Sequence, residues 1–408
     1  MTRSAVPFLI SWNLTKRCNL KCEHCYLDAA ELEGGEGDLT TAEALGIVDE
    51  IAELCPGAML ILTGGEPLAR PDLIDIVQYA SDKGLNVVLG TNGTLLNEAV
   101  ILRMKLAGLQ GVGLSLDSIN PVSHDDFRGS PGCWQKTVDA IDLLKKNDLE
   151  FQLQFTVTRN NYDEIPELIE FASQKGAKVA NVFFLVCTGR GQEMTDITPP
   201  QYEKMLTWLA KAEEEYAGKT MVRARCAPHF LRVVQQNSPD SSIMKGATSG
   251  CIAGSGYFRI SPEADVTPCP YMTTSGGNLK KESLVEIWDR SPIFKQMRAP
   301  QYNGKCGDCR YNDVCGGCRA RALSATGDVM GEDPWCDYEP DKAESGIALP
   351  HKGELGWTPE AKERLEKVPI FLRKMVKKGL ERYARTKGYQ VITPDIMEAM
   401  RSKVGGRR

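Results

Sequence analysis

Apolar and polar residues follow two alternating patterns in the first half of the chain. Short continuous apolar runs, typical of buried strands, lie at residues 8–14, 58–62, 86–90, 112–116, 151–158 and 179–186. Between them, apolar residues recur every three or four positions, which indicates amphipathic helices, for example at 41–54, 73–83, 134–146 and 165–175. Six repeats of strand and helix predict an α/β fold with a parallel sheet inside a layer of helices.

Polar residues stand where three of the predicted strands end. Asn92 follows the third strand, Ser115 belongs to the end of the fourth, and residues 156–159 end the fifth. Ligands of such folds gather at the carboxyl ends of the strands, so we expect a binding site at this edge of the sheet.

The pattern changes after a predicted helix at residues 199–216. Cysteines become frequent from Cys226 onward, and residues 257–269 predict a hairpin with its turn at 261–264. We therefore expect a first domain at residues 1–220 and a cysteine-rich second domain at residues 221–344.

The end of the chain carries helix signals of its own. Thr358-Pro359 and Thr393-Pro394 each predict a helix start, Pro369 interrupts the first helix and Gly388 ends the second. These signals predict a small module of three helices at residues 357–404.

Composition narrows the class of protein. Of 408 residues, 42% are hydrophobic and 25% are charged, which is ordinary for a soluble globular protein of two or three domains. No apolar run approaches the ~18 residues of a membrane span, and no signal-peptide pattern opens the chain. We expect a cytoplasmic protein, in which the 14 cysteines favour metal binding over disulfides.

Charge is distributed unevenly along the chain. Residues 351–408 hold 15 Lys and Arg against 7 Asp and Glu, whereas the whole chain has a net charge of −5. A basic tail can meet nucleic acid, an acidic partner or an acidic substrate, of which nucleic acid is the least favoured here.

Three cysteines, Cys18, Cys22 and Cys25, stand within eight residues directly after the first predicted strand. Thiolates crowded in this way suit soft metals, above all iron–sulfur clusters. A four-iron cluster held by three cysteines leaves one iron open to a non-protein ligand. A zinc knuckle is the alternative, but zinc sites usually close with a fourth ligand at short spacing. His24 stands between two of the cysteines, where its ring would struggle to reach the same metal.

The spacing Cys-x3-Cys-x2-Cys resembles the signature of the radical S-adenosylmethionine (SAM) superfamily. Residues 63–67, Thr-Gly-Gly-Glu-Pro, resemble the second motif of that superfamily and also end an apolar run. The resemblance implies a partial (β/α)6 TIM-like barrel and a 4Fe–4S cluster whose open iron chelates the amino and carboxyl groups of SAM. It also implies one-electron cleavage of SAM to a 5′-deoxyadenosyl radical.

The same resemblance assigns residues to SAM. Gly64 and Gly65 let the backbone approach a ligand closely, and Glu66 can accept hydrogen bonds from an ammonium. Asn92 and Ser115 are candidates for contacts to the ribose and the carboxylate, with ordinary capping of strand ends as the alternative. The loop from His124 to Gly129 resembles a recurrent loop of the superfamily, with either a substrate role or a helix-entry role.

Seven later cysteines resemble the SPASM extension, an auxiliary-cluster domain that follows many radical SAM barrels. Two departures from that pattern are Ala264, where the family has glycine, and a last gap of two residues in place of three. The family's interleaved pairing implies one or two auxiliary clusters. It assigns Cys306, Cys309, Cys315 and Cys336 to one cluster and Cys251, Cys269 and Cys318 to another, completed by Cys226 or by an open iron. Residues 306–318 alone also fit a zinc ribbon.

Two stretches resemble the tetrapyrrole-modifying members of this class. These are Cys315-Gly-Gly-Cys318-Arg-Ala-Arg-Ala322 and Gly331-Glu-Asp-Pro-Trp-Cys336, and the tail resembles a C-terminal module of light-independent protochlorophyllide reductase. The resemblance implies an oxidoreductase that decarboxylates or trims propionate side chains of a tetrapyrrole in haem or haem d1 biosynthesis. A coproheme or didecarboxysirohaem type of substrate is expected, with a low-potential donor such as ferredoxin or flavodoxin.

Two other functions stay open. One is peptide or protein maturation, although the first predicted strand begins so near Met1 that we expect no separate peptide-recognition domain before the barrel. The other is a non-catalytic iron–sulfur or nucleic-acid-binding protein.

Propionates need cationic partners, and guanidinium groups bind carboxylates in bidentate fashion. Arg190, Arg223 and Arg225 lie just past predicted barrel strands and are the candidates. His229 either ligates the iron of a macrocycle or has a structural role.

Overall fold

The computed structural model describes most of the chain, in two compact units. The first unit comprises Met1–Pro239 and Ala247–Pro340, and the second comprises Asp240–Gly246 and Asp341–Arg408. The residues described are 6–32, 37–194, 197–239, 241, 243–244, 250–340 and 356–366, with scattered positions from 373 to 398.

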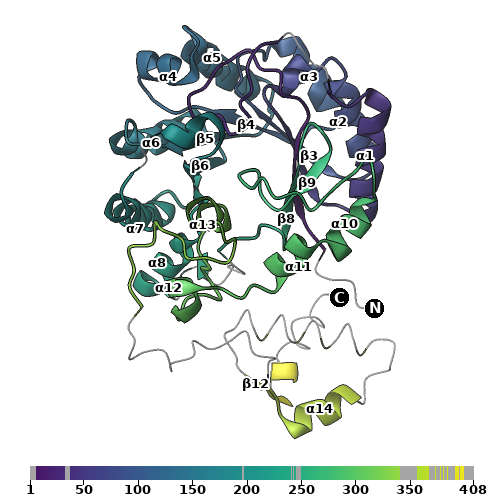
Figure 1. Cartoon of the computed structure of the whole chain (residues 1–408), viewed down its shortest axis with the longest axis vertical. Helices are drawn as coiled ribbons and strands as arrows, with labels where there is room; N and C mark the ends of the chain where they lie inside the picture. The colour runs from purple at the N-terminus through teal and green to yellow at the C-terminus, as the bar shows by residue number, and fades with distance from the viewer. Residues whose placement is uncertain are drawn as a thin grey trace. The chain divides into compact units, whose positions relative to one another are not determined.

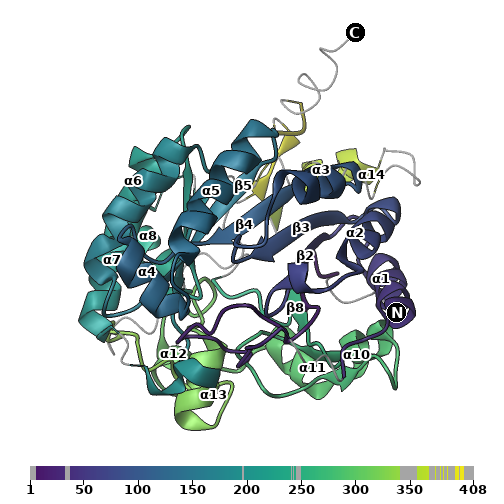
Figure 2. The same ribbon diagram turned by 90° about the horizontal axis from the view of Figure 1, so that it is seen from above.

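A parallel sheet forms the centre of the first unit. Its strands β1 to β7 are hydrogen-bonded in chain order, each parallel to the next. They are β1 (Leu9–Asn13), β2 (Met59–Thr63), β3 (Asn86–Thr91), β4 (Gly111–Ser115), β5 (Phe151–Val157), β6 (Val179–Phe184) and β7 (Met221–Arg225). Figures 1 and 2 show these strands surrounded by helices, so the predicted TIM-like α/β fold is confirmed.

The first six strands fall on the six predicted apolar runs, whereas β7 was not predicted. Its sequence, Met-Val-Arg-Ala-Arg, carries two arginines and lacks the continuous apolar run of the other strands. The seventh strand extends the sheet and brings Arg223 and Arg225 to its edge.

Helices connect the strands, and most begin at a polar cap. They are α1 (Thr41–Leu54), α2 (Leu73–Asp82), α3 (Glu98–Leu106), α4 (Pro121–Arg128), α5 (Cys133–Lys146), α6 (Ile165–Lys175) and α7 (Pro199–Glu215), with short 3-10 turns η1 (Pro67–Ala69), η2 (Tyr162–Glu164) and η3 (Gly189–Glu193). Thr40 and Glu43 form a capping box at α1, and Thr198 and Gln201 form another at α7.

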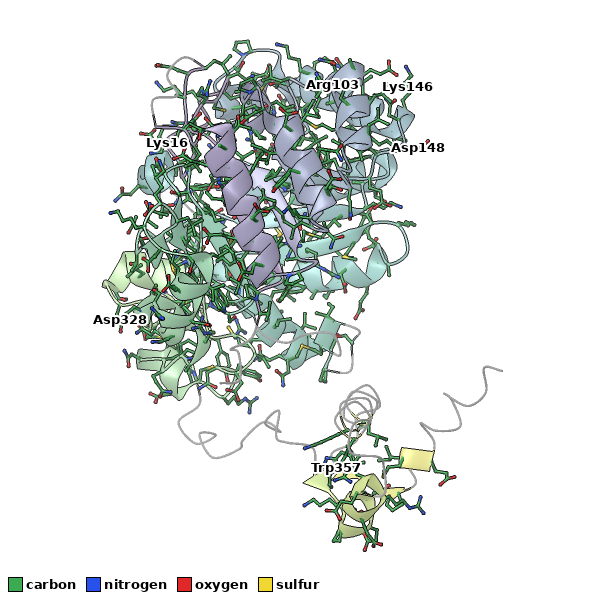
Figure 3. The ribbon with its side chains drawn as sticks, turned by 90° about the vertical axis from the view of Figure 1, so that its right-hand side faces the viewer. Lys16, Arg103, Lys146, Asp148, Asp328 and Trp357 are labelled. Carbon is green, nitrogen blue, oxygen red and sulfur yellow. The ribbon has the colours of Figure 1, made fainter. Side chains whose placement is uncertain are left out.

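The strands separate an apolar outer face from a polar inner face. In β5, Phe151, Leu153, Phe155 and Val157 are buried, whereas Gln152, Gln154 and Thr156 remain partly exposed. Successive side chains of a strand point to opposite faces, and α6 packs on β5, so the polar residues face the inside of the barrel. Lys146 lies on the outer surface of the first unit (Figure 3). It forms an exposed ion pair with Glu98 (2.8 Å), and such pairs contribute little to stability.

The cysteine-rich segment continues the same sheet. The predicted hairpin is confirmed, because β8 (Tyr257–Ile260) pairs antiparallel with β9 (Asp265–Thr267). In addition, β8 pairs parallel with β1, with Arg259 opposite Ser11, and β10 (Gly277–Asn278) pairs with β9. Ala264, at the family's glycine position, has a φ of 71° and so adopts the left-handed conformation that glycine adopts without strain.

Short helices complete the first unit. They are α8 (His229–Asn237), α10 (Leu284–Arg290), α11 (Pro292–Arg298), α12 (Gly304–Asp308) and α13 (Arg319–Thr326). Within the residues that the structure describes, no helix combines the length and the apolar character that crossing a bilayer requires.

In the second unit, α14 (Pro359–Glu366) begins where Thr358-Pro359 predicts it, and the Ala361 N–H donates to the Thr358 hydroxyl. A small apolar core joins Ala361, Leu380, Ala384 and Ile392. Two strands that were not predicted, β11 (Gly356–Trp357) and β12 (Val391–Ile392), pair in parallel. Pro369 and Gly388 lie outside the described residues.

Candidate active site and metal centres

The N-terminal cysteine loop follows β1 directly. Cys18 and Cys22 are buried, and Cys25 is half-buried. The sulfur of Cys18 accepts the N–H of Leu20 (3.4 Å), and that of Cys25 accepts the N–H of Ala29 (3.4 Å). A thiol sulfur is only a weak acceptor, so these donors fit sulfurs that carry the charge of a metal-bound thiolate.

Burial opposes the ionisation of these thiols without a metal. Desolvation raises the pKa of Cys18 to about 12, and it raises the pKa of Cys22 as well, although Arg128 counteracts it there. A bound metal ion ionises a coordinating thiol outright, so the loop suits cysteines that ligate metal.

Helix α4 holds this loop in place. The Arg128 guanidinium donates to the Cys22 sulfur (3.6 Å) and forms a buried ion pair with Asp117. The backbone carbonyls of Phe127 and Arg128 accept N–H groups of the loop, and the His24 ring stacks on Phe127 at 4.6 Å. The segment from His124 to Gly129 therefore supports the cysteine loop, which the sequence alone did not indicate.

Arg190, a predicted substrate contact, also belongs to this support. Its guanidinium donates to the carbonyls of Cys22 (3.0 Å) and Ala29 (2.8 Å) and pairs with Asp28 (2.7 Å). The position past β6 suggested a free cation, but the side chain is already engaged in folding the loop.

The two glycines of the second motif are required by the protein's own backbone. A side chain at Gly65 would meet the carbonyl oxygen of Arg17 at 2.3 Å, and one at Gly64 would meet that of Thr15 at 2.7 Å. The N–H of Gly65 donates to Thr15 (2.8 Å), so the motif packs tightly on the segment that leads into the cysteine loop.

Glu66 is a buried carboxylate at the same strand edge. It accepts hydrogen bonds from the Thr91 hydroxyl (2.7 Å) and from the backbone N–H groups of Asn92 (2.9 Å) and Leu68 (3.1 Å). Desolvation raises its pKa to about 7. Among the described residues it forms no ion pair, so a ligand that offers N–H donors fits beside it.

The two other predicted SAM contacts differ. Asn92 is buried, its side-chain oxygen accepts the N–H of Thr94 (2.9 Å), and its amide donates to Asn19 (3.0 Å), so capping already engages it. Ser115 is half-buried at the end of β4 and, in the described part of the chain, its hydroxyl makes no hydrogen bond. Ser115 therefore has a hydroxyl to offer to a ligand.

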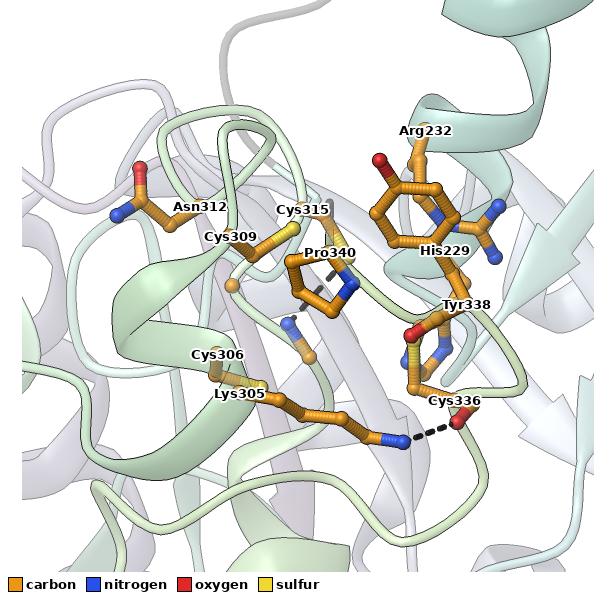
Figure 4. A pocket seen from close by; sticks show the side chains of 12 residues that line it. His229, Arg232, Lys305, Cys306, Cys309, Asn312, Cys315, Cys336, Tyr338 and Pro340 are labelled. Atoms are coloured by element: carbon orange, nitrogen blue, oxygen red, sulfur yellow. Dashed lines mark hydrogen bonds between the residues drawn. The ribbon is translucent and has the colours of Figure 1, made fainter. Parts of the chain in front are cut away.

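A second group of cysteines lines one cavity, together with His229, Arg232, Lys305 and Tyr338 (Figure 4). These are Cys306, Cys309, Cys315 and Cys336. The sulfurs of Cys309 and Cys315 accept the N–H groups of Tyr311 and Gly317, both at 3.4 Å. The Arg319 guanidinium donates to the Cys306 sulfur (3.7 Å), as Arg128 does in the N-terminal loop.

A third group interacts electrostatically, which places its members near one another. Burial raises the pKa of Cys269 well above its usual value, and the charges of Cys226, Cys318 and Cys251 raise it further. Burial likewise raises the pKa of Cys226 to about 12, with smaller contributions from Cys318 and Cys251. Cys226 thus joins the three cysteines that the family pairing assigns to one cluster.

Among the described residues, no three Cys, His, Asp or Glu side chains are arranged to bind one metal ion together. The cysteine ligands of an iron–sulfur cluster bind different irons, so they do not have to converge on one point.

A buried polar network packs between these groups. Asp333 accepts the N–H of Cys318 (2.7 Å) and forms an ion pair with Arg321 (3.0 Å), which also donates to the Cys226 carbonyl (3.0 Å). His229 lies 3.5 Å from Asp333 and hydrogen-bonds the Tyr202 hydroxyl (3.0 Å). Desolvation lowers the pKa of His229 to about 3, and its place in the network favours the structural role over ligation of a substrate iron.

The arginines of the barrel strands differ in whether a carboxylate already pairs with them. Arg223 is paired with Glu213 (2.6 Å), whereas Arg225 donates to the Asn181 side chain (2.7 Å). Arg259 of β8, which sequence reasoning missed, is buried and donates to Asn13. Neither Arg225 nor Arg259 has an acidic partner among the described residues, so both guanidinium groups can donate hydrogen bonds to a carboxylate ligand.

Family models match along the chain. The radical SAM superfamily model covers residues 12–172, the iron-sulfur cluster-binding SPASM domain model covers 251–319, and the model of the proto-chlorophyllide reductase 57 kD subunit covers 357–401. The AdoMet-dependent heme synthase of Methanosarcina barkeri is 41% identical over 82% of this chain and 98% of its own length. The chain belongs to the radical SAM superfamily. It is an enzyme of the SPASM class that uses a 4Fe–4S cluster, auxiliary iron–sulfur clusters and SAM.

Other members of the radical SAM superfamily show the same relationship. The AdoMet-dependent heme synthase of Nitratidesulfovibrio vulgaris is 37% identical over 81% of this chain and 92% of its own length. The pre-heme d1 synthase of Dinoroseobacter shibae is 32% identical over 83% and 88%. Among solved structures, Streptococcus suis SuiB bound to S-adenosylmethionine superposes with a TM-score of 0.67 at 15% identity, over 82% of this chain and 78% of that one, which confirms the fold.

Proposed function

We propose that this radical SAM enzyme decarboxylates or trims propionate side chains of a tetrapyrrole, in the formation of haem or haem d1. The observation that carries the proposal is the 41% identity to an AdoMet-dependent heme synthase over nearly its whole length. Two further relatives, named pre-heme d1 synthase and Fe-coproporphyrin III synthase, also have names that refer to tetrapyrroles. Relatives named PqqA peptide cyclase are 28–30% identical, and peptide maturation is the competing function.

We assign the cluster that cleaves SAM to Cys18, Cys22 and Cys25. The buried sulfurs and their N–H donors support this assignment. When bound, the cluster and SAM supply a 5′-deoxyadenosyl radical that abstracts hydrogen from the substrate. Glu66 and Ser115 offer a carboxylate and a hydroxyl to the cofactor, Gly64 and Gly65 place the backbone beside it, and Asn92 orders the adjoining loop.

We assign the auxiliary clusters to the two remaining groups. One is held by Cys306, Cys309, Cys315 and Cys336, which share a cavity. The other is held by Cys226, Cys251, Cys269 and Cys318, with Cys226 in place of an open iron because it lies among the other three.

The polar inner face of the barrel suits an acidic substrate. Arg225 and Arg259 are the propionate contacts that we propose, because each guanidinium is bonded to an amide oxygen and has no carboxylate partner in the described part of the chain. Arg190 and Arg223 do not serve, because they are engaged by Asp28 and Glu213.

The chemistry follows from a propionate, R–CH2–CH2–COO−. Removal of one hydrogen atom from the carbon next to the ring gives R–CH•–CH2–COO−, which breaks its bond to the carboxylate and yields R–CH=CH2, carbon dioxide and one electron. The role of the protein is to fix that carbon by its carboxylate and to exclude other hydrogen donors. We place the enzyme in the cytoplasm, with ferredoxin or flavodoxin as the source of the first electron.

Anaerobic incubation of the reconstituted enzyme with reductant, SAM and either coproheme or didecarboxysirohaem tests the proposal. The expected result is 5′-deoxyadenosine together with a macrocycle that has lost the mass of one or more carboxyl groups. If 5′-deoxyadenosine forms while both macrocycles keep their mass, the tetrapyrrole proposal is wrong. Modification of a peptide encoded beside the gene would then support the competing function.

A further inference from the structure

Two tyrosine rings meet between two of the cysteine groups. Tyr26 follows Cys25 in the chain, and Tyr271 stands two residues after Cys269, whose sulfur its backbone N–H bonds. The ring centroids are 5.2 Å apart and the planes are inclined by 64°, an edge-to-face contact. A continuous route of bonds and one ring contact thus leads from Cys25 to Cys269.

The proposed reaction both consumes and releases one electron, so it can use a route for electrons between the two cysteine groups. Cleavage of SAM consumes one electron, and R–CH•–CH2–COO− releases one electron when it becomes R–CH=CH2 and carbon dioxide. The sum is SAM and propionate to methionine, 5′-deoxyadenosine, vinyl group and carbon dioxide, with no net change in electrons. The released electron can therefore serve the next cleavage if it returns to the cluster at Cys18, Cys22 and Cys25.

We propose that the Tyr26–Tyr271 pair is the electron path between the auxiliary cluster of Cys226, Cys251, Cys269 and Cys318 and the N-terminal cluster. The auxiliary cluster takes one electron from the substrate radical, and the pair returns it to the N-terminal cluster. The direction of this flow rests on the proposed function, but the path itself does not.

In this proposal the rings carry the electron, and the Tyr26 hydroxyl does not take part. The Tyr26 hydroxyl accepts a hydrogen bond from the Asn13 amide (2.9 Å), and no base accepts its proton in the described residues. A tyrosyl radical formed by loss of a proton is therefore unsupported at this position. Phenylalanine keeps the ring contact, whereas leucine or methionine removes it, so the two kinds of substitution separate ring from hydroxyl.

The first experiment needs no substrate. Protein with its full content of iron and sulfide is photoreduced by one electron per chain, and rapid-freeze electron paramagnetic resonance (EPR) follows how the electron redistributes between the cluster signals. We expect Y26F and Y271F to behave like the wild type, and Y26L, Y26M and Y271L to lose the fast phase. F294L is the matched control, because it removes a buried ring contact of the same kind, between Phe294 and Trp288 (5.1 Å), that lies outside this route.

The proposal would be overturned if the leucine and methionine variants that retain their clusters redistributed the electron at the wild-type rate. An equal loss of the fast phase in F294L would overturn it as well. Only variants with wild-type iron content are scored, and substitutions at two positions guard against a single failure of assembly.

The second experiment counts vinyl groups formed per electron supplied, with coproheme as substrate. Wild type should form more than one product per electron, whereas Y26L and Y271L should stop near one. If no macrocycle is converted, the proposed function fails, while the EPR result still decides the electron path.

Discussion

Replacing Asp333 by asparagine removes the one negative charge of the buried network beside Cys318. Asp333 is fully buried, and Arg321, which is 4% exposed, forms its ion pair at 3.0 Å. Asparagine keeps the size of the side chain, but it leaves the guanidinium charged and uncompensated in the interior. Breaking a buried pair in this way costs about 3–5 kcal/mol.

The lost pair destabilises the auxiliary-cluster site that contains Cys226 and Cys318. Asp333 also accepts the Cys318 N–H (2.7 Å), and Arg321 donates to the Cys226 carbonyl (3.0 Å). We therefore expect D333N to lose the auxiliary cluster of this group and to keep the N-terminal one. The assay combines iron and sulfide content, EPR of each cluster and the free energy of unfolding in guanidinium chloride.

A surface pair supplies the control. Lys175 and Asp142 are bonded at 2.9 Å but are partly exposed, so D142N should change the free energy of unfolding by less than about 1 kcal/mol. Replacing both buried partners, as in D333L with R321M, should recover part of the lost stability because no unpaired charge remains. Wild-type iron content and a loss below ~1 kcal/mol in D333N would refute the reasoning.

Three further changes test other parts of the site. Burial raises the pKa of Glu66 from 4.5 to about 7, so the folded state binds the proton more tightly than the unfolded state. The free energy of unfolding should therefore fall by ~3 kcal/mol as the pH rises from about 4.5 to 7. Urea unfolding at a series of pH values should show this fall in the wild type and not in E66Q. R128M removes a donor and a positive charge from the Cys22 sulfur, so the reduction potential of the N-terminal cluster should fall in an EPR titration, whereas R128K should fall less. R225M should raise the KM for the macrocycle about tenfold or more with little change in kcat, because it removes a charged hydrogen bond of ~1.5–3 kcal/mol. An equal fall in kcat would contradict a binding role.

Local patterns were enough to predict the barrel. The apolar runs of β1 to β6 and the amphipathic pattern of α1 depend on neighbours in the sequence, and these elements lie where they were expected. Strand β7 was not predicted because its two arginines interrupt the apolar run. The pairing of β8 with β1 joins residues about 250 positions apart, and no local pattern encodes it.

The site was predictable in its ligands but not in its supports. Cysteine spacing marks the metal-binding groups because several ligands must fall close together in the chain. The contacts of Arg128 and Arg190 with the cysteine loop join segments more than 100 residues apart, so their role came only from the fold. Arg259 carried no motif, and its position follows from the register of β8 against β1.

The proposed reaction requires that Cys18, Cys22 and Cys25 hold a four-iron cluster with one iron open to SAM. EPR spectroscopy of the anaerobically reduced protein, recorded before and after SAM is added, tests it most directly, in a variant whose auxiliary cysteines are replaced by alanine. We predict a reduced 4Fe–4S signal whose g values shift on addition of SAM. A signal that SAM leaves unchanged, or zinc in place of iron at these cysteines, would contradict the account.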